Sequence, residues 1–236
     1  MKIRSTFLKI NEIPWALLVL VSVCSLFMFA EIINHRFWMS DFEVYYKAAD
    51  RILNGENLYR IVDDGHYIFK YSPTSAVLFI PFLVFPFGMA KIIYWLLLTF
   101  LVAVGFMLCI KMINSSLIEN HEYKSVNMII LMASLTLAIH FMRELHLGQV
   151  NYLLLFIYIW SVYFYQQKKI FLFGLLLAIS IFIKPFTLIF IPFLLLKRKY
   201  HEIAIFSGLV TALFLLPFVF YGSVSTTLGQ YQLWIN

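Results

Sequence analysis

Acidic residues gather in one polar segment near the start of an otherwise apolar chain. Residues 34–73 hold six of the twelve Asp and Glu residues, and Asp41 is the first of the six. A carboxylate held at a membrane surface has the chemistry of a general base that removes a proton from a hydroxyl group. A structural role is the alternative, because an acid in the first turn of a helix complements the helix dipole by about 0.3–1 kcal/mol.

A second polar stretch, residues 140–151, lies between two apolar runs and contains Arg143, Gln149 and Asn151. Ionisable groups at or within the membrane are costly and mark functional sites. Interfacial anchoring, with Arg143 balancing Glu144, is the alternative. The two histidines of this stretch have no Cys or carboxylate at the spacing of a metal site, so we expect no metal.

Lys184 lies deep in an apolar run, directly before Pro185. A lysine there is expensive unless its side chain reaches the interface or meets an anion. A compact ammonium group is a good partner for a lipid phosphate. The residue is therefore either a snorkelling lysine or a phosphate-binding cation.

The composition requires elements that cross a bilayer. The chain has 236 residues, of which 62% are hydrophobic and 13% charged, against about 25% charged residues in soluble domains. Continuous apolar runs predict an all-α, polytopic membrane protein, because helices satisfy their own backbone hydrogen bonds in lipid. The net charge of +6 comes from residues beside span ends, so we expect a bilayer and no nucleic acid as partner.

The basic residues predict the topology, since short basic loops face the cytoplasm. Ten of the eighteen Lys and Arg residues fall in four groups: Lys2/Arg4/Lys9, Lys111/Lys124, Lys168/Lys169 and Lys197/Arg198/Lys199. Placing all four on one side predicts about seven crossings within a single transmembrane domain, residues 1–236. Its parts are a first span (14–33), an outer acid-bearing loop (34–73), an interfacial or re-entrant helix (74–87), the remaining spans (90–221) and the start of an outer loop (222–236).

The number of spans within residues 170–196 stays open, and the outer loop contains a predicted helix. Residues 170–183 and 186–196 are two half-length spans or one kinked span, and a kinked span would put two basic groups on opposite sides. In the outer loop, Ser40 and Glu43 fit a capping box for a helix that runs from Asp41 to Leu53 and stops at Gly55. Its apolar residues are expected to lie on the membrane.

Several short motifs, in this order, resemble glycosyltransferase family 87, the polyprenyl-phosphate-mannose-dependent α-mannosyltransferases of the membrane GT-C architecture. The resemblance spans about Asp41 to Arg198. The motifs are Asp41, Val44–Tyr45, Ala48–Ala49, Gly55 and Tyr59, then Phe69–Pro73 with Ser72 in place of a proline, Gly148–Asn151 and Lys184–Pro185.

The resemblance implies an inverting transfer of a hexose, mannose in this family, from a polyprenyl-phosphate donor to a glycan or glycolipid acceptor. Asp41 would be the catalytic base, and Lys184 and Arg143 would bind the donor phosphate. Tyr45, Gln149 and Asn151 would bind substrate oxygens, and no cofactor is implied. The site would face the outside of a bacterial plasma membrane, with a cytoplasmic N-terminus.

The chain is shorter than members of the family, and this difference leaves other functions open. Family members continue through further spans, so the sequence predicts a fragment or a truncated copy, and an inactive truncated copy is the first alternative function class. A transporter or flippase of lipid-linked sugars is the second alternative, because Lys184 and Arg143 would grip a lipid phosphate equally well.

Overall fold

The computed structural model describes residues 14–117 and 123–235, and these residues form helices and no strands. Four helical segments among them are long and apolar enough to cross a membrane: Trp15–Ile33, Phe87–Ile113, Val126–Leu147 and Tyr200–Tyr221. They correspond to α1 (Trp15–Ile33), α5 (Phe87–Leu117), α6 (Tyr123–Leu147) and α10 (Tyr200–Leu215) with α11 (Phe218–Tyr221). The predicted all-α membrane fold is confirmed, and the count of seven crossings stays a prediction.

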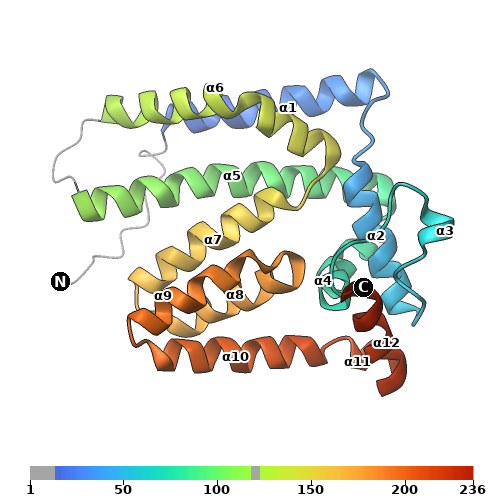
Figure 1. Ribbon diagram of the computed structural model, residues 1–236. Helices are drawn as coiled ribbons and strands as arrows, with labels where there is room; N and C mark the ends of the chain where they lie inside the picture. The colour runs from blue at the N-terminus through green and yellow to red at the C-terminus, as the bar shows by residue number, and fades with distance from the viewer. Residues whose placement is uncertain (1–13, 118–122, 236) are drawn as a thin grey trace.

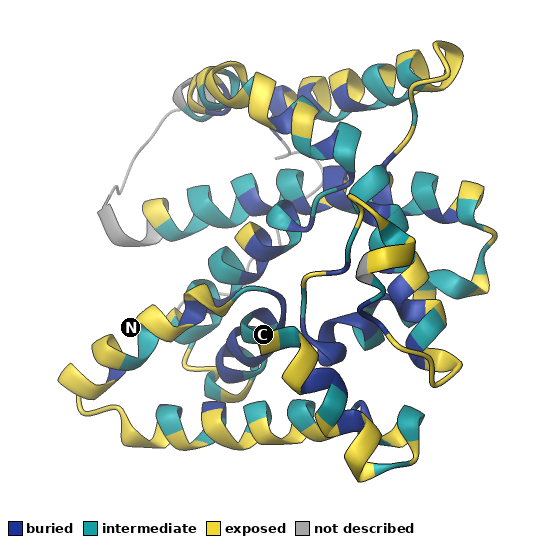
Figure 2. Ribbon diagram, turned by 45° about the vertical axis from the view of Figure 1, so that its right-hand side comes forward, coloured by how far each residue is buried: buried dark blue, intermediate teal, exposed yellow. Residues whose placement is uncertain are grey.

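The long helices run roughly parallel to one another (Figure 1). Helix α1 packs on α6 and α5, and α5 packs on α7 (Asn151–Gln166). Helix α8 (Ile170–Ile183) then packs between α7 and α10. Large apolar side chains stay exposed on the outer flanks, where Leu26 is 68% and Ile139 82% exposed. Figure 2 shows such exposed residues along the outward faces of the helices, the surface that lipid would cover.

The apolar run around Lys184 forms two short helical segments. Helix α8 ends at Ile183, Lys184 takes an extended conformation, and a 3₁₀ helix, η3 (Pro185–Ile189), leads into α9 (Phe190–Leu196). Figure 1 shows that α9 returns beside α8. The turns that carry Lys168/Lys169 and Lys197–Lys199 therefore lie at one end of the molecule, as the two-span alternative requires. The first basic group, Lys2/Arg4/Lys9, lies outside the described residues.

Short elements cover the opposite end of the bundle (Figure 1). They are α2 (Ser40–Leu53), α3 (Ile61–Asp64), α4 (Pro73–Phe79), the 3₁₀ helix η2 (Ile80–Val84) and α12 (Val224–Ile235). Helix α12 occupies residues that the sequence predicts as loop-like. Gln230 in α12 accepts a 3.1 Å hydrogen bond from the backbone N–H of Leu58, which holds the loop after α2 against the C-terminal helix.

Two predictions about α2 were wrong, although its bounds are close to those expected. Met39, with φ 49°, occupies the N-cap position, and no side chain caps the helix, so the capping box of Ser40 and Glu43 does not form. The apolar face does not lie on the membrane. Phe42 is fully buried and stacks on Tyr94 of α5 with ring centroids 4.3 Å apart, because α4, η2 and α5 cover this face.

Candidate active site

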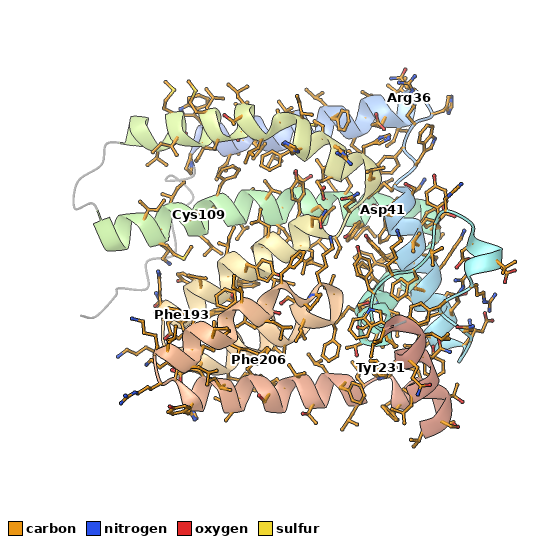
Figure 3. All side chains as sticks on the ribbon, in the orientation of Figure 1. Arg36, Asp41, Cys109, Phe193, Phe206 and Tyr231 are labelled. Carbon is orange, nitrogen blue, oxygen red and sulfur yellow. The ribbon has the colours of Figure 1, made fainter. Side chains whose placement is uncertain are left out.

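Asp41 lies in the first turn of α2, at the end of the bundle that the short helices cover (Figure 3). The turn between α6 and α7 comes close to this end of α2. Gly148, with φ +68°, makes that approach possible, because a Cβ atom there would lie 2.9 Å from Met39 Cε and 2.9 Å from Phe42 Cβ. Only glycine combines a positive φ with this close packing at low cost.

Helix α6 extends further than the sequence predicts. Residues 140–147 form its last turns instead of a connecting stretch, and only residues 148–150 separate α6 from α7. His146 Nδ1 lies 2.6 Å from Glu31 Oε2 on α1, which ties the end of α6 to the end of α1. This short, braced connection positions Gln149 and Asn151 beside α2.

A hydrogen-bond network connects three of the predicted residues. Lys184 Nζ donates to Asn151 Oδ1 at 2.7 Å. Asn151 Nδ2 in turn donates to Gln149 Oε1 at 2.7 Å and to Glu144 Oε1 at 3.1 Å. With its carbonyl oxygen occupied in this way, Gln149 is left with its amide N–H groups as donors.

Asp41 lies beside this network and is half-buried. Burial raises the pKa of Asp41 above its usual value of 3.8, and three interactions oppose the rise: a side-chain hydrogen bond with Gln149 and the charges of Lys70 and Lys184. A carboxyl group whose pKa is raised by burial is suited to accept a proton as a general base.

Lys70 reaches the site through a second docked segment. Ser72 donates hydrogen bonds to the carbonyl oxygen of Phe182, at 3.2 Å from its backbone N–H and at 2.7 Å from its hydroxyl. A proline at position 72 could donate neither bond, so the departure from the family pattern has a structural use here. Ser72 thereby holds Lys70 and Tyr71 close to the end of α8 that carries Lys184.

A cavity of about 160 Å³ opens beside Asp41. Its other lining residues are Val44, Tyr45, His66, Tyr67, Ile68, Lys70 and Tyr71. Tyr45 is almost fully buried, and its hydroxyl lies 3.3 Å from the hydroxyl of the less buried Tyr71. Tyr71 is therefore the tyrosine better placed to meet a ligand in this cavity, with Tyr45 behind it.

Arg143 is exposed, and no hydrogen bond or ion pair joins it to the described residues of the network, although its charge acts on Glu144. The structure thus brings Asp41, Gln149, Asn151 and Lys184 together and leaves Arg143 at the edge. Within residues 14–117 and 123–235, no group of His, Cys, Asp and Glu has a metal-site arrangement, and the absence of a metal stays a prediction.

Sequence reasoning assigned no role to Glu144 or Lys70. Glu144 lies three residues before the end of α6, and its place beside Arg143 in the sequence suggests only a balance of charge. Lys70 stands inside the aromatic motif at Phe69–Pro73. The signal that could have found both is the same one that pointed to Lys184, a charged residue next to an apolar run.

The fold and the site together define a polytopic membrane protein with a carboxylate and two lysines gathered at one end of a helical bundle. The family model of glycosyltransferase family 87 matches residues 69–234, and the chain belongs to this family of membrane glycosyltransferases. The matched range includes Lys70, Gln149, Asn151 and Lys184, and it begins after Asp41 and Tyr45. Neither the curated proteins nor the solved structures contain a match to the chain.

Proposed function

We propose that the protein transfers a hexose, mannose, from a polyprenyl-phosphate donor to a glycan or glycolipid acceptor outside the cytoplasm, with inversion at the anomeric carbon. One observation carries the proposal. Asp41 and Lys70 line one cavity, beside the hydrogen-bonded chain that joins Gln149, Asn151 and Lys184, and the charges of both lysines act on the Asp41 carboxylate. A base and two phosphate-compatible cations are thus within one site.

In this reaction the acceptor hydroxyl attacks the anomeric carbon of the donor sugar. Asp41 takes the hydroxyl proton as the new glycosidic bond forms. The bond between the anomeric carbon and the phosphate oxygen breaks on the opposite side, and polyprenyl phosphate leaves with the bonding electrons. Lys184 and Lys70 would stabilise the charge that develops on this phosphate, which preorganised cations do best in a partly dry site.

The supporting residues take narrower roles than the sequence alone implies. Gln149 orients Asp41, and Asn151 positions Lys184 through the 2.7 Å hydrogen bond. Tyr45 supports Tyr71 in the cavity wall. Arg143 is assigned to the edge of the donor site, where an exposed cation attracts an anionic lipid before it binds.

The placement outside the cytoplasm rests on charge. The turn between α7 and α8, which carries Lys168 and Lys169, and the turn between α9 and α10, which carries Lys197–Lys199, lie at the end of the bundle opposite α2 (Figure 1). Short basic turns face the cytoplasm, so the site would face the other side. A bacterial plasma membrane fits this arrangement.

The test is transfer of radiolabelled mannose from polyprenyl-phosphate mannose to a mixed glycan acceptor in proteoliposomes. Wild type should form labelled product and Asp41→Asn should not. Asp50→Asn is the matched control, because Asp50 is exposed on the same helix and meets only Asn54 among the described residues, at 3.3 Å. Full transfer by Asp41→Asn would refute the assigned base.

A transporter of lipid-linked sugars is the second candidate, because Lys70 and Lys184 would hold a lipid phosphate without any chemistry. It predicts movement of the intact labelled lipid across the vesicle membrane with no new glycosidic bond. The same vesicles measure both outcomes.

A further inference from the structure

Glu144 is a half-buried carboxylate that the proposed reaction does not use. Its Oε1 accepts the 3.1 Å hydrogen bond from Asn151. Its Oε2 is buried, and the described residues offer this oxygen no hydrogen-bond partner. A buried carboxylate oxygen without a hydrogen-bond partner is costly, so this position calls for an explanation.

The position of Glu144 argues against a purely structural role. Glu144 lies within the candidate site, because Asn151 donates a 3.1 Å hydrogen bond to it and the charges of Lys184, Arg143 and Asp41 act on its carboxylate. A second carboxylate beside Asp41 repels that base and would also repel a donor phosphate. Its unpartnered oxygen is instead suited to a group that donates hydrogen bonds.

The hydroxyl groups of a hexose are such donors. An ionised carboxylate only accepts hydrogen bonds, and bonds to a charged acceptor are roughly twice as strong as neutral ones. Asn151 holds one oxygen of Glu144 and so fixes the direction of the other. We propose that Glu144 Oε2 accepts a hydrogen bond from a hydroxyl of the donor hexose and sets the preference of the site for a sugar-bearing lipid.

This inference rests on the proposed donor, and Glu144→Gln tests it sharply. Asn151 Nδ2 donates to position Oε1, so a glutamine must turn its own oxygen toward Asn151. The amide N–H₂ group then occupies the place of Oε2. The substitution therefore exchanges an acceptor for a donor at nearly constant shape and leaves the Asn151 contact in place.

The measurement is binding, without turnover, of two lipids to the purified full chain in detergent: polyprenyl-phosphate mannose and sugar-free polyprenyl phosphate. Wild type should prefer the sugar-bearing lipid, and Glu144→Gln should lose about 10- to 100-fold of that preference, the range for a hydrogen bond to a charged group. Binding of the sugar-free lipid should stay the same or tighten. Glu43→Gln is the matched control, because it makes the same chemical change in a partly exposed carboxylate of α2 that forms an ion pair with Lys47 at 2.7 Å.

A set of donor analogues, each lacking one sugar hydroxyl, gives a second readout. Wild type should discriminate against one analogue in particular, and Glu144→Gln should not. An unchanged preference in the variant, or equal binding of all analogues by wild type, would mean that Oε2 holds an ordered water only and would overturn the proposal. Failure of mannose transfer with the sugar preference intact would instead count against the glycosyltransfer reaction.

Discussion

Lys184 Nζ donates a hydrogen bond of 2.7 Å to Oδ1 of Asn151, 33 residues earlier in the chain. The contact joins the extended residue at the end of α8 to the first residue of α7. It aims the ammonium group into the site and leaves further N–H donors free for an anion. The position of the Lys184 ammonium group and the orientation of the Asn151 side chain therefore depend on each other.

Removing the Lys184 charge should impair the reaction more than the fold. Lys184→Gln retains a donor for Asn151 but loses the cation, so we expect transfer to fall by about 10²–10³-fold, as for loss of one group that stabilises developing charge. The proteoliposome transfer assay measures this change. Lys197→Gln, at the opposite end of the bundle and exposed, should transfer at the wild-type rate. Equal losses in both variants would point to a general effect of charge on insertion.

The pH dependence of transfer should show the raised pKa of Asp41. The base must be ionised, so kcat/KM should fall as the pH drops through a pKa above 3.8. Gln149 lowers this pKa by hydrogen bonding, so Gln149→Leu should move the acidic limb to higher pH. A pH–rate profile of both proteins measures the shift. An acidic limb that stays in place would remove Gln149 from contact with the base.

Asp41→Asn should leave the protein at least as stable as wild type at neutral pH. A carboxyl group whose pKa is raised in the folded protein contributes stability below 3.8 that is lost as the pH rises through the raised pKa. Asparagine does not titrate, so the variant should not lose stability as the pH rises through this pKa. Thermal melts in detergent at pH 7 and pH 4 compare the two proteins, and a much lower melting temperature for the variant at pH 7 would contradict the assignment.

Gly148→Ala should destabilise the junction of α2 with the α6–α7 turn by about 1–3 kcal/mol, because it combines a positive φ with overpacking. The added Cβ would meet Met39 and Phe42 at 2.9 Å. Transfer should fall too, since the same turn positions Gln149. Gly208→Ala in α10 is the control, with nothing within 4 Å of an added Cβ. Melting temperature and transfer rate are read on both variants.

Arg51 in α2 donates two hydrogen bonds, of 2.6 and 2.5 Å, to the two carboxylate oxygens of Asp64. This pair holds the segment after α2 in place. The bond from Arg51 lowers the pKa of Asp64 below 3.8, so this contribution to stability is present above 3.8 and is lost as the pH falls through the lowered pKa. Arg51→Lys cannot make both bonds and should cost about 1–3 kcal/mol. Chemical unfolding at pH 7 and pH 3 measures the difference, which should shrink at the lower pH.

Local sequence patterns predicted much of the secondary structure. The run 170–183 coincides with α8, and Gly55, with φ +69°, follows α2 where the stop was expected. The capping box failed because a tertiary contact replaces it: Met39 is fully buried and packs near Gly148. Helix α6 continues past its apolar stretch into polar residues, where the sequence pattern predicts its end. The contact of His146 with Glu31 supports these last turns.

The order of apolar and charged residues is enough to predict the class of protein and the kinds of groups available for chemistry. Uninterrupted apolar runs leave helices as the elements that satisfy the backbone in lipid, and charged residues beside them mark a site by their cost. Which of these groups meet depends on how the helices pack in three dimensions. Helices pack according to the side chains along their whole length, which local patterns do not show. Three features of this packing build the site: the chain reversal at Lys184, the close turn at Gly148 and the hydrogen bonds of Ser72 to Phe182. They bring together Asp41, Gln149, Asn151 and Lys184, place Glu144 beside them and leave Arg143 at the edge.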